Sequence, residues 1–342
     1  MRPSSQQTKH YFFLLAGLCL FVPFLIFVFC IVAFSKNQDH LGAIPLNEDH
    51  TWYRDFSGRV LAEIQDQDIF YHNIGHSIEA VKSADIVFTG PSYVSYALDP
   101  ETLKSFDTKH QLKSYNLSFI GIRPGAFTRS LIQRWHIQPK LWVLNADHYI
   151  FHFFENEWKL TLGPSTTSIP SMHYSKLQAW LNVIGRNLKW RMEDAWYNSN
   201  TAPTPSGIYR NVENGHFYHT NPGYYAKNNT FITLVPGSEN CHISEKNIDY
   251  ARKFLKDLNG KVVLMLTPHK EYCPQQAHEL AKALNLELIV TPDTNYTSGD
   301  GGAHLDQKGA QKYTQFLLSE LEKTAAFNSI QNAIFEYDHD KK

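Results

Sequence analysis

The sequence predicts an α/β domain in which helices cover both faces of a doubly wound parallel sheet of about five strands, giving three layers. Short apolar runs recur along the chain, and amphipathic stretches of helical length separate them. Strands that alternate with helices in this way form parallel βαβ units. A long polar and aromatic segment, about residues 151–230, interrupts the alternation and predicts an inserted lobe.

The expected strands are apolar runs that end at glycine, proline or polar residues. They cover residues 84–90, 114–119, 140–147, 261–268 and 286–290. The expected helices cover residues 78–83, 99–106, 126–135, 244–258, 274–285 and 307–323, with a further one at 171–196 inside the insertion. The helix at 99–106 carries a start signal, because Asp99 can cap it and Pro100 suits its first position.

Residues 11–34, from Tyr11 to Phe34, form an apolar run of 24 residues without a charged side chain. A bilayer core takes about 20 helical residues, so we expect an uncleaved, single-pass anchor in the inner or plasma membrane. A cleaved signal peptide is the alternative, but its apolar part typically has only about 7–15 residues. Arg2 and Lys9 precede the run, which favours a cytoplasmic N-terminus and a periplasmic or extracellular domain.

The expected organisation has four parts. Residues 1–35 are a cytoplasmic tip and the anchor, 36–70 a juxtamembrane stalk, 71–330 the α/β domain with its insertion, and 331–342 a tail that ends in the polar stretch YDHDKK, expected to be disordered. Cys241 and Cys273 fall in the exported part, where a disulfide is permitted; the sequence leaves their pairing open. The net charge of −1 gives no electrostatic argument for a nucleic-acid partner.

Chemically capable residues follow four of the expected strands at their carboxyl ends. They are Ser92 after the first, Gly121 after the second, Asn145 and Asp147 after the third, and Asp300 and His304 after the fifth. In an open parallel sheet these ends share one edge, where ligands bind. A serine nucleophile needs a base, an oxyanion needs preorganised donors, and the base needs an orienting partner. The set therefore predicts nucleophilic acyl chemistry.

The order of these residues resembles the SGNH, or GDSL-like, hydrolases. Ser92 in TGPSYVSYALDP matches the nucleophile block, and Gly121 in NLSFIGIRPG matches the glycine block, with Gly125 as the alternative. Asn145 in LWVLNAD matches the asparagine block, and His304 in GDGGAHLDQKGAQKYT matches the closing block. The resemblance covers about residues 84–147 and 261–323 and leaves out the insertion.

This resemblance implies a flavodoxin-like, SGNH-type sheet and a role for each residue. Ser92 is the nucleophile, His304 the general base and Asp300 its orienting acid. The N–H groups of Ser92 and Gly121, with the Asn145 side chain, hold the oxyanion, and no metal or organic cofactor is expected. Membrane-anchored members of the superfamily remove or transfer acyl groups on cell-surface polymers. We therefore expect a glycan substrate and, by analogy alone, a multispanning acyl-donor protein as a partner.

The chain departs from the family pattern in three blocks, with G-P-S-Y at the nucleophile, N-A-D at the asparagine and D-x-x-x-H at the end. The longer closing spacing leaves Asp293 or a main-chain carbonyl as alternatives to Asp300. The departures also leave open a non-catalytic module that binds a polysaccharide or an assembly partner.

A metal-dependent hydrolase is a further alternative, because close histidine pairs can bind zinc when other ligands converge. These pairs are His148 with His152 and His216 with His219. Four tryptophans crowd the insertion, where they could stack on sugar rings or fill a secondary core: Trp158, Trp180, Trp190 and Trp196.

Overall fold

The structure is a computed structural model that describes residues 17, 21, 22, 51–54, 69–70, 73–119, 124–151, 208–219, 230–233, 241–270, 273–292 and 295–339. Of the expected anchor, only Gly17, Phe21 and Val22 are among them, and all three are helical. Within the described part of the chain, no helix combines the length and the apolar character that crossing a bilayer requires.

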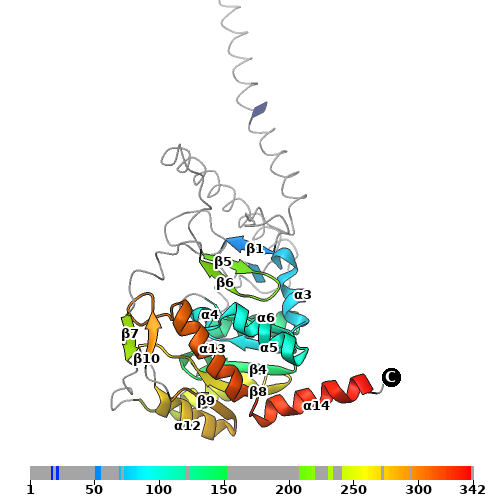
Figure 1. The fold of residues 1–342 in the computed structure, drawn as a ribbon. Helices are drawn as coiled ribbons and strands as arrows, with labels where there is room; N and C mark the ends of the chain where they lie inside the picture. Colours follow the sequence, from blue (N-terminus) through cyan, green and yellow to red (C-terminus); the bar gives the residue numbers. More distant parts are fainter. Residues whose placement is uncertain are drawn as a thin grey trace, which may run out of the picture.

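A five-stranded parallel sheet forms the centre of the molecule (Figure 1). Its strands lie in the order β3 (Ser114–Asn116), β2 (Ile86–Thr89), β4 (Leu141–Asn145), β8 (Lys261–Leu266) and β9 (Glu287–Val290). Every neighbouring pair is parallel, which confirms the α/β prediction. The order is that of a flavodoxin-like sheet, whose connections change direction between its first and third strands. Here that point lies between β2 and β4.

The strands β2 and β4 are buried along their whole length. Strands covered on both faces read as continuous apolar runs rather than as alternating ones, and this explains why the sequence identified them. In β4 the residues from Leu141 to Leu144 are all apolar, and the strand ends at the buried polar Asn145.

Helices flank the sheet in two groups, and within each group the helices contact one another. One group holds α4 (Ser92–Ala97), α5 (Pro100–His110) and α13 (Gln307–Leu321); the other holds α6 (Pro124–Trp135), α7 (His148–Phe151), α11 (Glu245–Leu255) and α12 (Pro274–Leu284). Right-handed crossovers place such groups on opposite faces. Asp99 caps α5 by accepting a hydrogen bond from the Thr102 N–H, as expected, but the helix continues to a left-handed turn at Gln111.

The C-terminal tail is a helix rather than a disordered segment, over the residues that the structure describes. Helix α14 (Ala325–His339) includes the first three residues of YDHDKK. Its side chains Phe327 and Ile330 are buried against the core, and this burial of apolar surface stabilises the helix. The polar residues at the end of the sequence did not indicate it. The prediction that YDHDKK is disordered is therefore wrong for residues 337–339.

Part of the expected juxtamembrane stalk belongs to the folded domain. Strand β1 (Trp52–Arg54) pairs antiparallel with β5 (Ile208–Asn211), which pairs with β6 (Phe217–His219). Phe70 is fully buried and packs edge-on against Phe119 of the main domain. A separate stalk over residues 36–70 is thus wrong for these residues, because the backbone of β1 extends a small sheet and Phe70 makes a core contact.

The β5–β6 hairpin is attached to the end of β3 through a buried arginine. The Arg210 side chain has no exposed surface. Its Nη2 donates to the Asn116 carbonyl at 2.6 Å, and its guanidinium lies over the rings of Phe70 and Phe217 at 4.5 and 4.7 Å. The α3 helix (Ser77–Lys82), which follows the short turn η1 (Ile74–His76), lies beside this small sheet (Figure 1).

The end of the insertion pairs with the segment that leads to His304. Strand β7 (Thr230–Thr233) is antiparallel to β10 (Asn295–Ser298), within a stretch that the sequence predicted to be a loop. The expected helix at 171–196, and with it three of the four tryptophans, lies outside the described residues, as does Trp158.

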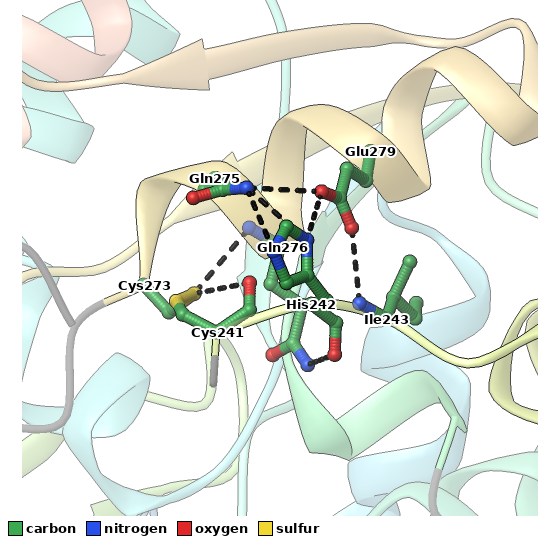
Figure 2. The surroundings of a disulfide bond; sticks show 7 residues. All are labelled: Cys241, His242, Ile243, Cys273, Gln275, Gln276 and Glu279. Atoms are coloured by element: carbon green, nitrogen blue, oxygen red, sulfur yellow. Dashed lines mark hydrogen bonds and ion pairs between the residues drawn. A yellow bond between two sulfur atoms is a disulfide. The ribbon is translucent and has the colours of Figure 1, made fainter. Parts of the chain in front are cut away.

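Cys241 and Cys273 form a disulfide, with their Cα atoms 6.2 Å apart (Figure 2). The bond links the segment before α11 to Cys273, the N-cap residue of α12. Glu279 of α12 strengthens this link, because it accepts hydrogen bonds from the Ile243 N–H at 3.0 Å and from the His242 ring at 2.7 Å. The disulfide therefore holds the start of α12, where the connection from β8 ends, against the segment that precedes α11.

Candidate active site

Ser92 is the first residue of α4 and follows β2 after Gly90 and Pro91. Pro91 has an extended backbone, so the chain changes abruptly from strand to helix. A Cβ at Gly90 would lie 2.4 Å from Val94 Cγ2 and 3.0 Å from Asn145 Cβ. The missing side chain thus lets the first turn of α4 lie against the end of β4.

Ser92, His304 and Asp300 form one hydrogen-bonded line. The His304 Nε2 is 2.9 Å from the Ser92 Oγ, and its Nδ1 is 2.5 Å from the Asp300 Oδ2. Ser92 and His304 are separated by 212 positions in the chain. The expectation that they share one edge of the sheet is therefore confirmed.

A tight turn with two glycines brings Asp300 back onto His304 despite the longer D-x-x-x-H spacing. Gly301 and Gly302 have φ angles of 77° and 103°, in the region that favours glycine. The Asp300 Oδ1 accepts the His304 N–H at 2.8 Å, so the carboxylate holds both the backbone and the ring. The Ser298 hydroxyl at the end of β10 donates to the His304 carbonyl at 2.7 Å.

The charge on Asp300 assigns the direction of each hydrogen bond in the line. Burial raises the pKa of this carboxyl, but hydrogen bonds from His304 and the charge on its ring outweigh burial, so the pKa lies below its ordinary value. An ionised carboxylate only accepts hydrogen bonds, and therefore Nδ1 of His304 carries a proton. In the neutral ring Nε2 then bears the lone pair, and the Ser92 hydroxyl donates to it.

Asn145 supplies a buried amide donor at the same edge. Its side chain has no exposed surface, and its Oδ1 accepts the Thr267 N–H at 3.0 Å. This bond fixes the orientation of the amide, so that Nδ2 points away from the Thr267 N–H. Among the described residues, Nδ2 has no hydrogen-bond partner, although buried polar groups are nearly always paired.

The remaining predicted residues have varied outcomes. Gly121 and Asp293 lie outside the described residues. Gly125 lies in α6, where a Cβ would come 1.9 Å from the Tyr149 carbonyl oxygen, so its small size serves helix packing. The Asp147 Oδ1 accepts the Tyr149 N–H at 2.9 Å and supports the turn into α7.

Four further residues at this edge were not identified from the sequence. Tyr96 packs its ring against that of His304, with centroids 4.5 Å apart. Tyr93 stacks on His269, with centroids 4.1 Å apart and an interplanar angle of 7°, and Thr267 is also buried here. A usable signal existed for two of them, because Thr267 and His269 follow the fourth expected strand just as Asn145 follows the third.

Within the described part of the chain, no cluster of three or more His, Cys, Asp or Glu side chains could hold a metal ion, and a zinc site at the histidine pairs stays a prediction. His152 lies outside that part. His216 is buried beside Arg210, and burial followed by the arginine charge lowers the pKa of His216 to about 4, against a smaller opposing effect of Asp99.

No protein-family model, curated protein or solved structure matches the chain.

Proposed function

We propose that this protein is a serine-dependent esterase or O-acyltransferase that acts on a short acyl group, such as acetyl, carried by a cell-surface glycan. One observation supports the proposal above all others: His304 accepts a hydrogen bond from Ser92 while it donates one to Asp300. A serine hydroxyl becomes a competent nucleophile only when a base can take its proton, and this arrangement supplies an oriented base.

The reaction begins when the Ser92 Oγ attacks the ester carbonyl carbon as its proton passes to the His304 Nε2. Asp300 stabilises the resulting imidazolium and keeps the ring in place. The tetrahedral intermediate then collapses, and Nε2 returns the proton to the departing sugar oxygen. The acyl group remains on Ser92 as an ester.

The oxyanion of the intermediate needs donors that are in place before the reaction. The Asn145 Nδ2 is such a donor, since the Thr267 N–H holds the opposite side of the amide. The Ser92 N–H is a second, because the first N–H groups of a helix have no intrahelical acceptor. Gly121 would supply the third.

The second half of the reaction releases the acyl group to water or to another sugar hydroxyl, with His304 again removing the proton. The acceptor decides between hydrolysis and transfer. Neither half requires a metal ion or an organic cofactor. The likeness of the residue order to the SGNH hydrolases supports the same chemistry.

The apolar residues 11–34 support an extracytoplasmic location with an N-terminal membrane anchor, as part of the same proposal. A periplasmic or cell-surface site would give the enzyme access to a glycan, and a multispanning membrane protein in the same bilayer could supply the acyl group. The disulfide between Cys241 and Cys273 is compatible with an oxidising compartment.

The test is acetate release from a chromogenic acetyl ester by the full-length chain and by Ser92→Ala. The proposal expects turnover that the substitution abolishes, and Ser95→Ala is the matched control, because its hydroxyl lies in the same helix and is bonded to Ser118. Equal rates in wild type and Ser92→Ala would remove Ser92 from the mechanism. A complete absence of turnover would favour the binding module, and loss of turnover with a chelator would favour the metal-dependent alternative.

A further inference from the structure

Three residues linked by contacts at the ends of β4 and β8 each carry a buried polar atom without a hydrogen-bond partner among the described residues. The atoms are the Tyr93 Oη, the Asn145 Nδ2 and the Thr267 Oγ1. Their residues are 8%, 0% and 0% exposed. Buried polar groups in native proteins are nearly always paired, so three such atoms on linked residues indicate a ligand or ordered water that pairs them.

A continuous chain of contacts joins the three residues. The Thr267 N–H donates to the Asn145 Oδ1 at 3.0 Å, the His269 Nδ1 donates to the Thr267 carbonyl at 3.0 Å, and the His269 ring stacks on Tyr93. Since β4 lies between β2 and β8, Tyr93 reaches from the nucleophile's own helix across the end of β4. The three residues therefore form one wall beside Ser92.

The far end of this wall is also tied to the catalytic loop. The Lys270 N–H, next to His269, donates to the Gly302 carbonyl at 2.8 Å. Gly302 lies in the turn between Asp300 and His304. The His269 ring is thus bonded to the Thr267 carbonyl and stacks on Tyr93, while the next residue along the chain is bonded to the catalytic loop.

The chemistry of the wall selects a neutral polar ligand. Tyr93 and Thr267 each offer a hydroxyl that can donate and accept, and Asn145 offers an amide donor. Phosphate and carboxylate groups are usually bound by arginine or lysine, and these three residues carry no charge. Sugar hydroxyl groups both donate and accept hydrogen bonds, as the hydroxyls of Tyr93 and Thr267 do.

We propose that Tyr93 and Thr267 bind hydroxyl groups of the sugar that carries the ester, while Asn145 holds the oxyanion. This inference rests on the proposed esterase or transferase function and adds the residues that select a carbohydrate ester over a simple one. It places the alcohol side of the substrate across the end of β4, toward β8.

The experiment compares kcat/KM for methyl 6-O-acetyl-glucoside with kcat/KM for 4-nitrophenyl acetate, which has no sugar hydroxyl. In Tyr93→Phe and in Thr267→Val the ratio of the two values is expected to fall about tenfold, as for the loss of one hydrogen bond of about 1.4 kcal/mol. The controls are Tyr115→Phe and Thr324→Val, whose buried hydroxyls bind the Val212 and Leu321 carbonyls away from this wall. Their ratios are expected to equal that of wild type.

An unchanged ratio in both Tyr93→Phe and Thr267→Val would overturn the inference and assign the two hydroxyls to ordered water. Absence of Ser92-dependent turnover on either ester is a different result, because it contradicts the proposed function. In that case saturation-transfer NMR of the sugar ester with the Ser92→Ala chain still tests the wall. Binding that Tyr93→Phe weakens in this background supports the inference, and no binding, or binding that the substitution leaves unchanged, refutes it.

Discussion

Replacing Asn145 by aspartate separates the amide's role in catalysis from its role in the fold. The side chain is fully buried, its Oδ1 accepts the Thr267 N–H, and its Nδ2, which we propose binds the oxyanion, has no hydrogen-bond partner among the described residues. Asn145→Asp keeps the acceptor and removes the donor. Losing one preorganised oxyanion donor lowers kcat by about 10²–10³, and a negative carboxylate facing the oxyanion adds to that loss.

Asn145→Ala is the comparison variant, because it removes the acceptor as well. It leaves the buried Thr267 N–H unpaired, which costs about 1–3 kcal/mol of stability. We expect both variants to lose activity in a steady-state assay of acetate release. In urea unfolding the alanine variant should lose this stability at every pH, whereas the aspartate variant should be destabilised only as the pH rises and its buried carboxyl becomes charged.

The aspartate variant also has a distinctive pH dependence. Burial raises the pKa of a carboxyl group, and a protonated carboxyl can donate a hydrogen bond. The ratio of variant to wild-type kcat should therefore rise as the pH is lowered from about 8 to 5, toward the raised pKa. A kcat equal to wild type at every pH would show that Asn145 does not contact the oxyanion and would refute the reasoning.

Three more predictions concern the acid, a buried histidine and the disulfide. Asp300→Asn should lower kcat by about 10⁴, because an amide that turns its NH₂ toward Nδ1 of His304 moves the ring proton to Nε2 and removes the base; near-normal kcat would contradict this. His216 has a pKa of about 4 when folded against 6.5 as its ordinary value, so the unfolded chain binds more protons between these values and stability falls by up to about 3 kcal/mol as the pH drops from 6.5 to 4. In His216→Gln this part of the pH slope of urea unfolding should disappear, and an identical slope would exclude it. Reducing the disulfide, whose cysteines are 32 positions apart, should cost about 3–4 kcal/mol of unfolding free energy; a Cys241→Ser, Cys273→Ser variant should not respond to reductant, and equal midpoints for reduced and oxidised wild type would contradict the estimate.

The central sheet and the residues at its carboxyl edge could be predicted because both depend on local patterns. Buried parallel strands are continuous apolar runs, and their carboxyl ends meet wherever the sheet is parallel. Ser92, Asn145 and His304 were identified in this way. The same rule applied to the end of β8 would also have identified Thr267 and His269.

Pairings between distant segments could not be predicted from one sequence. Strand β1 pairs with β5 and β10 pairs with β7, and each pair joins short segments whose apolar content alone does not indicate a strand. The role of Asp300 was similarly open, because the D-x-x-x-H spacing fits the family only when the backbone turns back on itself. The positive φ angles of Gly301 and Gly302 supply that turn.

The short helix α4 was also missed. Its six residues follow Gly90 and Pro91 and include two tyrosines, so no capping side chain or long apolar period marks it. The helix matters for the site because its spacing puts Tyr96 one turn beyond Ser92, where the Tyr96 ring packs against His304.

Labelling with a fluorophosphonate, followed by peptide mapping, tests the central claim most directly. The reagent reacts with a serine only when a base activates its hydroxyl. The account predicts one phosphonylated residue, Ser92, in the full-length chain, and no labelling of this peptide in His304→Ala. No labelling of the wild type, or labelling of Ser92 at the same rate without His304, would contradict it.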